Sequence, residues 1–371
     1  MRIERLELYY VRLPLIYPWR TAYGSDHEID SVLIHAYAGA ADAWSETTPL
    51  RAPTYSPEWA LGVYSLIAEI MAPLLVGHEL DSPEALLERI RPFKGNPFAK
   101  GGLEGAWWHL QAKIEGRPLH ELLGGTWRTV DAGADFGIQD SVDMLLGKIQ
   151  AAIDRGHKRV KLKYGPGWDL EVLKAVRATF PRHTFHIDCN AGYTLDDLPM
   201  FAEIDKLGLA MIEQPLHYAD LLDHAELQRR IDTPICLDES VKSVRDFELA
   251  LQLGSCRVLN IKPMRVGGLS AAVKLHDMAR EAGIPCWVGG MLESGVGAGT
   301  LIELATLGNF TYPNDLFPSD RFYTQDLTDP AVAMNADCTF TPSAVPDIPY
   351  EPLLSRVQAA ARFSKVIEAP R

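Results

Sequence analysis

The sequence predicts an α/β protein in which a (β/α)8-type barrel, a modified TIM barrel, follows an N-terminal α+β capping domain. Two observations favour this fold. From residue 126 to residue 326, short β-rich runs alternate with helical patterns, and five of these runs end in a charged residue at almost constant spacing. Eight runs are expected to be strands: residues 132–136, 159–163, 184–188, 210–213, 234–238, 258–262, 285–289 and 309–312.

Residues 1–125 mix two kinds of pattern, which indicates an α+β capping domain. Alternation of apolar and polar residues predicts strands over 2–13 and 31–44. Helical spacing predicts helices over 57–75, 83–90 and 99–115.

Two polar segments of this domain, 15–30 and 50–57, are expected to be long loops that cover the substrate. The first contains Trp19 and Tyr23, and the second contains Tyr55. Such an aromatic side chain closes over a ligand or only pins its loop, and both roles remain open.

The spacing of charged residues in the barrel region is the most informative pattern in the chain. Lys163, Asp188, Glu213 and Asp238 follow one another at intervals of 25 residues, and Lys262 comes 24 residues later. Because the carboxyl ends of barrel strands converge on one face, these five side chains are expected to form a ring around one mouth of the barrel.

The last segment, 327–371, is rich in proline and then helical in pattern from 352 to 367. It is too short to form a domain of its own. We expect it to leave the barrel and return to the capping domain.

The charge balance restricts the partners of this protein. The 371 residues include 36 Lys and Arg against 49 Asp and Glu, a formal charge of −13, so nucleic acid and anionic membranes are not expected partners. The N-terminus lacks the apolar core of a signal peptide, and the 5 cysteines lack the close pairs of a zinc or redox motif. These features predict a cytoplasmic protein with a small-molecule substrate.

The three acids of the ring, Asp188, Glu213 and Asp238, suit a hard divalent cation, above all Mg²⁺. One such acid alone more often caps a helix or forms a salt bridge. Three acids in phase, with lysines in the same phase on either side, favour the metal site over that alternative.

The lysines indicate acid–base chemistry. Lys161 and Lys163 lie two residues apart on one predicted strand and therefore point to the same side, where a like charge and a metal would disfavour the protonated amine. Lys262 is expected to reach the same cavity. A neutral lysine beside a metal-bound carboxylate favours removal of a proton alpha to that carboxylate. The alternative is an edge-like strand with two solvated lysines.

Several segments resemble the muconate lactonizing enzyme subgroup of the enolase superfamily, namely 160–163, 187–191, 212–216, 237–240 and 260–263. Segments 263–268, 289–295 and 318–323 resemble the o-succinylbenzoate synthase / N-succinylamino acid racemase family of that subgroup. The similarity covers essentially the whole chain.

The resemblance implies a role for each matching residue. Lys163 and Lys262 would be the acid/base pair, and Lys161 would orient the substrate carboxylate and lower the pKa of Lys163. Asp188, Glu213 and Asp238 would hold Mg²⁺, or Mn²⁺ or another divalent cation in its place. Further residues would lie near the metal or the substrate: Asn190, Glu239, Arg265, Met291, Leu292, Glu293 and Ser294. Backbone groups around Met291 to Ser294 would receive the acyl end of the substrate.

Some positions depart from the family pattern. Asp135 stands where related sequences tend to carry a serine near the substrate, and Gly297-Ala298-Gly299 replaces a Gly-Arg-Ala type of segment. An extra acid beside an anionic ligand is unfavourable unless it pairs with a cation, so Asp135 bears on substrate choice.

The resemblance implies a Mg²⁺-dependent racemase of N-acyl (N-succinyl) amino acids, since Arg265 resembles an arginine typical of members with racemase activity. The alternative is o-succinylbenzoate synthase, a dehydratase of menaquinone biosynthesis, either in place of the racemase or as a second activity of the same site. A dipeptide epimerase, a cycloisomerase or a non-catalytic barrel are further alternatives. A homo-oligomer is expected.

Overall fold

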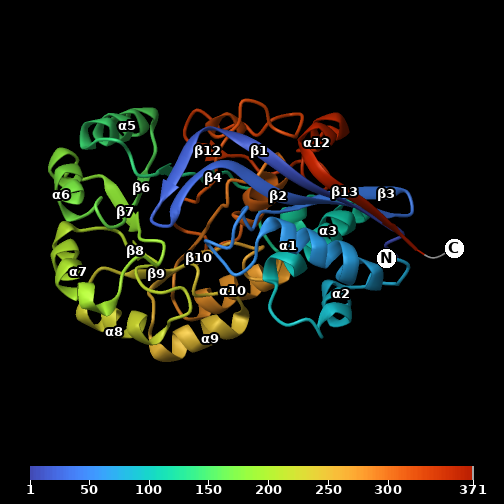
Figure 1. Cartoon of the computed structure of the whole chain (residues 1–371), viewed down its shortest axis with the longest axis horizontal. Helices are drawn as coiled ribbons and strands as arrows, with labels where there is room; N and C mark the ends of the chain where they lie inside the picture. The colour runs from blue at the N-terminus through green and yellow to red at the C-terminus, as the bar shows by residue number, and fades with distance from the viewer. Residues whose placement is uncertain (370–371) are drawn as a thin grey trace.

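The computed structural model describes residues 1–369 and contains a four-stranded antiparallel sheet beside a curled parallel sheet (Figure 1). In the antiparallel sheet the strand order is β13-β1-β2-β3. These strands are β1 (Arg5–Thr21), β2 (Gly24–Ala38), β3 (Ala41–Thr47) and β13 (Ala361–Glu368). The predicted α/β class, with its barrel and its separate N-terminal sheet, is confirmed.

The predicted loop over 15–30 is wrong, because β1 and β2 continue through it as one long hairpin. The two strands pair from Arg5 to Thr21, with an irregularity after Pro14, and turn tightly before Gly24, whose φ of 140° suits glycine. The hairpin tip reaches the barrel, where the backbone N–H of Ile138 donates to the carbonyl of Arg20 over 3.1 Å. The segment that contacts the barrel at this point is therefore a β-hairpin and not an irregular loop.

The helices of the N-terminal half pack on one face of the antiparallel sheet (Figure 1). The predicted helix over 57–75 begins at Ala60 and changes its winding along its length, and the other two expected helices are present. They are α1 (Ala60–Leu66), the π segment Ile67–Met71, the 3-10 turn Ala72–Leu74, α2 (Pro83–Ile90), α3 (Pro97–Glu115) and α4 (Leu119–Leu122). Ser82 caps α2 by accepting from the N–H of Ala85.

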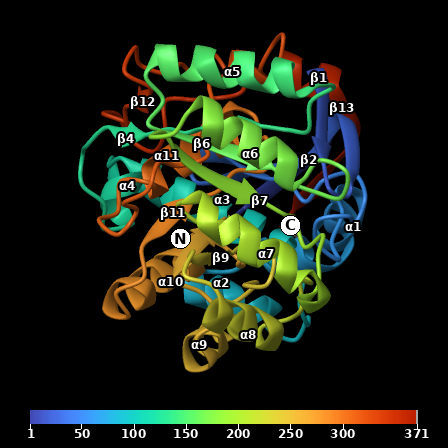
Figure 2. The same ribbon diagram turned by 90° about the vertical axis from the view of Figure 1, so that its left-hand side faces the viewer.

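The parallel sheet contains seven strands in sequential order, β5 to β11, and its helices lie in succession around the outside (Figure 2). The strands are β5 (Ala134–Phe136), β6 (Arg159–Lys163), β7 (Thr184–Asp188), β8 (Ile212–Glu213), β9 (Ile235–Leu237), β10 (Val258–Ile261) and β11 (Cys286–Val288). The helices are α5 (Val142–Arg155), α6 (Leu170–Thr179), α7 (Leu198–Ile204), α8 (Leu222–Arg230), α9 (Val244–Leu253), α10 (Leu269–Glu281) and α11 (Gly295–Leu304). Short 3-10 turns occupy Leu195–Asp197, Asp205–Leu207 and Ser319–Arg321.

The eighth predicted strand, 309–312, does not form a continuous strand of the parallel sheet. Its place is taken by two isolated parallel bridges, from Cys286 to Phe310 and from Ala132 to Asn314. The first bridge joins the segment after β11 to β11 itself, and the second joins it to the residues before β5. The eighth position of the barrel is therefore occupied by only a few paired residues.

The C-terminal segment is helical only over α12 (Leu354–Ala360), and the predicted helix over 352–367 is wrong beyond that point. Residues from Ala361 onward form β13, which pairs antiparallel with β1 from Arg5 to Val11. The free edge of β1 offers backbone donors and acceptors that a helix would leave unpaired, which favours the strand. Earlier in this segment, β12 (Thr339–Phe340) pairs with β4 (Val130–Asp131).

Buried glutamates connect the antiparallel sheet and α3 to the parallel barrel. Glu104 of α3 accepts from the N–H groups of Leu269 and Ser270 at the start of α10. Glu46 of β3 accepts from the N–H groups of Ser294 and Gly297 at the start of α11. A carboxylate at a helix N-terminus is electrostatically favourable, so these contacts fix the orientation of the two parts. No helix within residues 1–369 is long and apolar enough to cross a membrane.

Candidate active site

The register of the parallel sheet places the predicted ring of charges at one level. Lys163 of β6 is the Cα partner of Asp188 of β7, and Asp188 is the partner of Glu213 of β8. Asp238 and Lys262 follow directly after β9 and β10. A spacing of 25 residues therefore corresponds to one step around the barrel, as the sequence predicts.

Each acid of this ring has a nitrogen donor beside it. Lys163 Nζ donates to Asp188 Oδ2 over 2.6 Å, and Lys262 Nζ donates to Asp238 Oδ2 over 2.9 Å. Glu213 Oε1 accepts from the side-chain amide of Asn260 over 2.6 Å. The three carboxylates are at most 1% exposed, so these contacts lie in a region of low dielectric constant where they are strong.

Lys161 is surrounded by carboxylates. Its Nζ lies 3.3 Å from Asp135, 3.6 Å from Asp188 and 3.7 Å from Glu213, and it also donates to Asp315. The other oxygen of Asp315 pairs with Arg159, which is buried two residues before Lys161 on the same strand, β6. Lys161 is thus the centre of a buried charge network and not a solvated surface lysine.

The neighbouring acidic groups raise the pKa values of all three lysines. The lowering expected from a like charge together with a bound metal ion stays a prediction. Burial lowers the pKa of Lys163, but the charge of Asp188 outweighs burial and the net pKa is raised. The pKa of Lys161 is raised well above its usual value because the charges of Asp135 and Asp315 outweigh its burial. Burial lowers the pKa of Lys262, but Tyr55 and the carboxylate of Glu239 favour the charged amine, and the net pKa is raised.

A pocket opens above these side chains, between the barrel and the N-terminal sheet. It is lined by Trp19, Tyr23, Asp26, Ile29, Leu50, Tyr55, Asp135, Lys161, Lys163, Asn190, Lys262, Gly290, Met291, Leu292, Asp315 and Phe317. Most of the predicted substrate-contact residues are therefore brought together in one place. Burial raises the pKa of both Tyr23 and Tyr55 to about 12, which keeps the two phenols neutral and able to donate.

Tyr55 connects the second covering segment to the charges below. Its hydroxyl donates to Asp238 Oδ1 over 2.8 Å, and Lys262 Nζ lies 4.4 Å from the centre of its ring. Trp19, in contrast, is 7% exposed and packs edge-on against Phe322, with the ring centres 5.5 Å apart. Tyr55 thus contacts the charged side chains at the strand ends, whereas Trp19 lies in the pocket wall.

Two predicted residues, Arg265 and Glu239, do not line the pocket. Arg265 pairs with Asp238 and donates to the carbonyl of Asn260 over 2.6 Å. Asn190 donates to Glu239 over 3.2 Å, and burial together with the charge of Asp188 raises the pKa of Glu239 to about 7.

Glu293 and Ser294 do not line the pocket over the lysines. The expectation that backbone groups around Met291 to Ser294 receive the acyl end of the substrate stays a prediction. Glu293 turns back and accepts from the N–H of Met291 over 2.8 Å. Ser294 is fully buried at the start of α11, where its hydroxyl donates to Glu46 over 2.6 Å. Both side chains hold the turn after β11, and Gly290, Met291 and Leu292 of that turn line the pocket.

The suitability of the site for a cation follows from oxygen atoms that lack partners. Among residues 1–369, no three carboxylate, histidine or cysteine side chains converge closely enough to hold a metal ion as they are arranged, since lysines and Arg265 occupy the acids. Yet Glu213 Oε2, Asn190 Oδ1 and Glu239 Oε2 are buried without a hydrogen-bond partner in the described part of the chain. Buried oxygens without a donor are costly, and a hard cation would satisfy them.

The structure adds residues that the sequence interpretation missed. Asp315 pairs with Lys161, and Asn260 holds Glu213. His186 lies with Nε2 3.6 Å from Glu213 Oε2, and burial lowers its pKa to about 4, so it is neutral. Asp315 comes 53 residues after Lys262 and is out of step with the 25-residue spacing, so the spacing does not identify it. Nor does the spacing identify Asn260 or His186.

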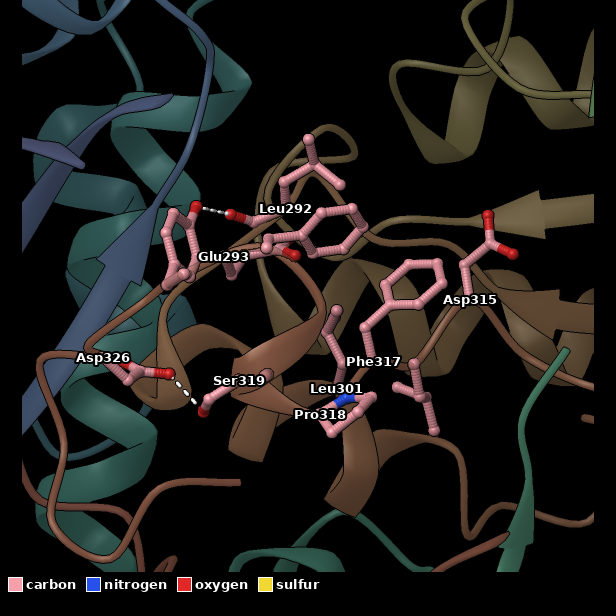
Figure 3. Close-up of a pocket in the computed structure, with 12 residues that line it drawn as sticks. Leu292, Glu293, Leu301, Asp315, Phe317, Pro318, Ser319 and Asp326 are labelled. Atoms are coloured by element: carbon pink, nitrogen blue, oxygen red, sulfur yellow. Dashed lines mark hydrogen bonds between the residues drawn. The ribbon is translucent and has the colours of Figure 1, made fainter. Parts of the chain in front are cut away.

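Asp315 also borders a neighbouring pocket, which Figure 3 shows. Leu292, Asp315 and Phe317 line both this pocket and the one over the lysines, and they form the wall between them. Asp315 lies across the neighbouring pocket from the hydrogen bond that Ser319 donates to Asp326 (Figure 3). That bond holds the segment after Asp315 in place.

Comparison with known families and proteins agrees with this architecture. Residues 5–124 match the mandelate racemase / muconate lactonizing enzyme N-terminal domain, and residues 145–345 match the enolase C-terminal domain-like family. The N-succinylamino acid racemase of Thermus thermophilus is 43% identical over 332 residues, 90% of each chain. The o-succinylbenzoate synthase of Geobacillus kaustophilus is 39% identical over 367 residues, 99% of this chain and 98% of that one. A crystal structure of an enolase superfamily member from Listeria innocua superposes with a TM-score of 0.94 at 34% identity and covers 99% of both chains.

Proposed function

Since the chain belongs to the enolase superfamily, and within it to the mandelate racemase / muconate lactonizing enzyme family, we propose that it racemizes N-acyl amino acids, with N-succinyl as the acyl group. The observation that supports this proposal is that Lys163 and Lys262 line one pocket from strands four steps apart, β6 and β10. Two bases on different sides of one cavity suit removal of a proton from one face of a carbon and its return to the other.

In the proposed reaction Lys163 takes the proton from the alpha carbon and Lys262 delivers a proton to the opposite face, or the reverse for the other enantiomer. Lys161 orients the substrate carboxylate. The carbon between the two lysines passes through a planar enediolate, so both enantiomers share one intermediate. Tyr55, Trp19 and Leu50 cover the pocket from above and exclude water from the proton transfer.

We propose Asp188, Glu213 and Asp238 as the residues that hold Mg²⁺, with Asn190 and Glu239 beside it; Mn²⁺ or another divalent ion would fit the same oxygen donors. When bound, the ion would supply positive charge that compensates the carboxylates and the negative charge that develops on the substrate. Asn260 fixes the orientation of Glu213 through its 2.6 Å hydrogen bond, and Arg265 and Tyr55 do the same for Asp238.

A second candidate function is o-succinylbenzoate synthase. A relative of that name, from Geobacillus kaustophilus, aligns over 99% of this chain. In that dehydration Lys163 acts as base and then as acid on one face, while Lys262 stays cationic. The contact of Lys262 with the Tyr55 ring, at 4.4 Å, favours a cationic Lys262. One site could support both reactions, because each requires only the enediolate.

The test of the proposed function is proton exchange at the alpha carbon in deuterated water, with Mg²⁺ and separate L- and D-N-succinyl amino acids. The wild type is expected to exchange the proton of both enantiomers and to interconvert them. Lys262→Ala is expected to retain exchange with only one enantiomer and to lose racemization. Lys174→Ala, an exposed lysine on α6, is the matched control and should behave as the wild type. Full racemization by Lys262→Ala would contradict the proposal.

We also propose a division into a capping unit, 1–125 with 327–371, and a catalytic barrel, 126–326; the pairing of β13 with β1 supports it. A cytoplasmic location is supported by the cysteines of the described chain, which are all free and buried. The homo-oligomer expected from the sequence remains a prediction.

A further inference from the structure

Asp135 is the acid that departs from the family pattern, and one of its two oxygens has no partner. The residue is 4% exposed, lies in the middle of β5 and lines the pocket over the lysines. Its Oδ2 lies 3.3 Å from Lys161 Nζ, and the two residues are Cα partners in the sheet. Its Oδ1 is buried and accepts no hydrogen bond from any residue between 1 and 369.

The neighbouring donors are already engaged elsewhere. Lys161 donates to Asp315, and Arg159 donates to Asp315 and to the carbonyl of Ala134. Arg321 donates to the backbone carbonyl of Asp135 and not to its side chain. A buried carboxylate oxygen without a donor is unfavourable, so the free Oδ1 is suited to a donor that arrives with a ligand.

The position of Asp135 relative to Lys161 indicates which donor that is. If Lys161 orients the substrate carboxylate, as proposed above, then the group that reaches Asp135 is attached close to that carboxylate. In an N-acyl amino acid the amide nitrogen and the carboxylate carbon are bonded to the same alpha carbon. The far end of the acyl chain lies several bonds away and cannot reach Lys161 and Asp135 together with the carboxylate.

We propose that Asp135 Oδ1 accepts a hydrogen bond from the amide N–H of the N-acyl amino acid substrate. This inference rests on the proposed function and refines it. A carboxylate only accepts, whereas a serine hydroxyl at this position could also donate to an acyl carbonyl. Asp135 therefore selects substrates whose group on the alpha carbon is an N–H donor, and disfavours esters and N-alkylated amides of the same shape.

The hydrogen bond also has a consequence for geometry. With the carboxylate held by Lys161 and the N–H held by Asp135, two of the four substituents of the alpha carbon are fixed. Since both lysines line the pocket, the hydrogen on that carbon is then directed toward one of them, Lys163 or Lys262, according to the enantiomer. Asp135 is thus a specificity-determining contact that also helps to present the proton to the bases.

The experiment compares an N-succinyl amino acid with the O-succinyl 2-hydroxy acid of the same side chain, which has an ester oxygen in place of the N–H. kcat/KM for alpha-proton exchange is measured for both, with Mg²⁺, in the wild type, Asp135→Ala and Asp135→Asn. The ratio of amide to ester is expected to fall about tenfold or more in Asp135→Ala, because a hydrogen bond to a charged group is lost only by the amide. Asp135→Asn keeps an acceptor oxygen and should give an intermediate ratio. Intrinsic differences in acidity between amide and ester cancel when variants are compared.

Asp131→Ala serves as the control, since Asp131 pairs with Lys158 outside the pocket and should leave the ratio unchanged. If Asp135→Ala exchanges too slowly to assay, calorimetric Kd values for the two ligands give the same ratio, after circular dichroism has shown that the variant is folded. An amide-to-ester ratio in Asp135→Ala equal to that of the wild type would overturn the inference and leave the racemase proposal intact. Lack of exchange with every N-acyl amino acid would overturn the racemase proposal instead, and equal wild-type Kd values for amide and ester would then overturn this inference as well.

Discussion

Lys163 Nζ and Asp188 Oδ2 lie 2.6 Å apart, at paired positions of the adjacent strands β6 and β7. The contact joins the proposed base to a proposed metal ligand. Burial lowers the pKa of Lys163, but the carboxylate of Asp188, which Lys161 also approaches to 3.6 Å, raises it above its usual value. Asp188 thus favours the protonated form of the lysine.

Removal of divalent metal is the first prediction. Dialysis against EDTA is expected to abolish alpha-proton exchange, and added Mg²⁺ to restore it. Asp188→Asn should lower exchange at saturating Mg²⁺ by at least about 100-fold, since loss of outer partners of metal ligands alone costs 10- to 100-fold. Exposed Asp196→Asn is the control. Full activity in protein shown by elemental analysis to be free of metal would refute this prediction.

Replacement of Asp315 is the second prediction. Asp315→Asn leaves the buried cations Arg159 and Lys161 without their shared acid, which should lower the free energy of unfolding by about 3–5 kcal/mol. Exchange activity should fall as well, because Lys161 loses its anchor. Urea unfolding and exchange kinetics measure the two effects. Asp320→Asn, at an exposed position of the same segment, is the control and should change neither stability nor exchange activity. An unaltered urea midpoint in Asp315→Asn would contradict the stabilising role of the contacts of Asp315 with Arg159 and Lys161.

The contact between the N-terminal sheet and the barrel gives the third prediction. Glu46 accepts from Ser294 N, Ser294 Oγ, Gly297 N and Thr48 Oγ1, so Glu46→Ala removes the acceptor of four buried donors. We expect a loss of about 3 kcal/mol in unfolding free energy and a higher KM, since the turn with Met291 and Leu292 precedes Ser294. Exposed Glu115→Ala is the matched control. Stability and KM equal to the wild type would contradict the role assigned to Glu46.

The pH dependence of stability gives the fourth prediction. Burial raises the pKa of Glu58 from 4.5 to about 7, in spite of the hydrogen bonds from the N–H groups of Phe98 and Ala99. The folded state therefore binds this proton more tightly than the unfolded state, and the contribution to stability is fully present below pH 4.5 and is lost as the pH rises to about 7. The wild type should lose up to about 3 kcal/mol relative to Glu58→Gln across this window. Urea titrations from pH 5 to pH 8 measure the difference, and parallel curves for the two proteins would contradict the shift.

Most of the fold could be predicted because its signals are local. The runs at 159–163 and 184–188 match β6 and β7 in both bounds, since short β-rich runs between helical patterns have few alternatives. The hairpin over 15–30 and the strand β13 could not be predicted. Each forms by pairing with another strand: the polar end of β1 pairs with β2, and β13 pairs with the edge of β1. Such pairing overrides a weak local preference for loop or helix.

The sequence by itself determined the order of the barrel strands and the phase at which Lys163, Asp188, Glu213, Asp238 and Lys262 meet, because one strand-helix unit fixes one step around the barrel. The tertiary structure decided which charge pairs with which. Lys161 and Asp315 are 154 residues apart, and Tyr55 and Asp238 are 183 residues apart. No local pattern encodes such contacts, which arise only when closure of the barrel and docking of the N-terminal sheet bring the side chains into one buried volume.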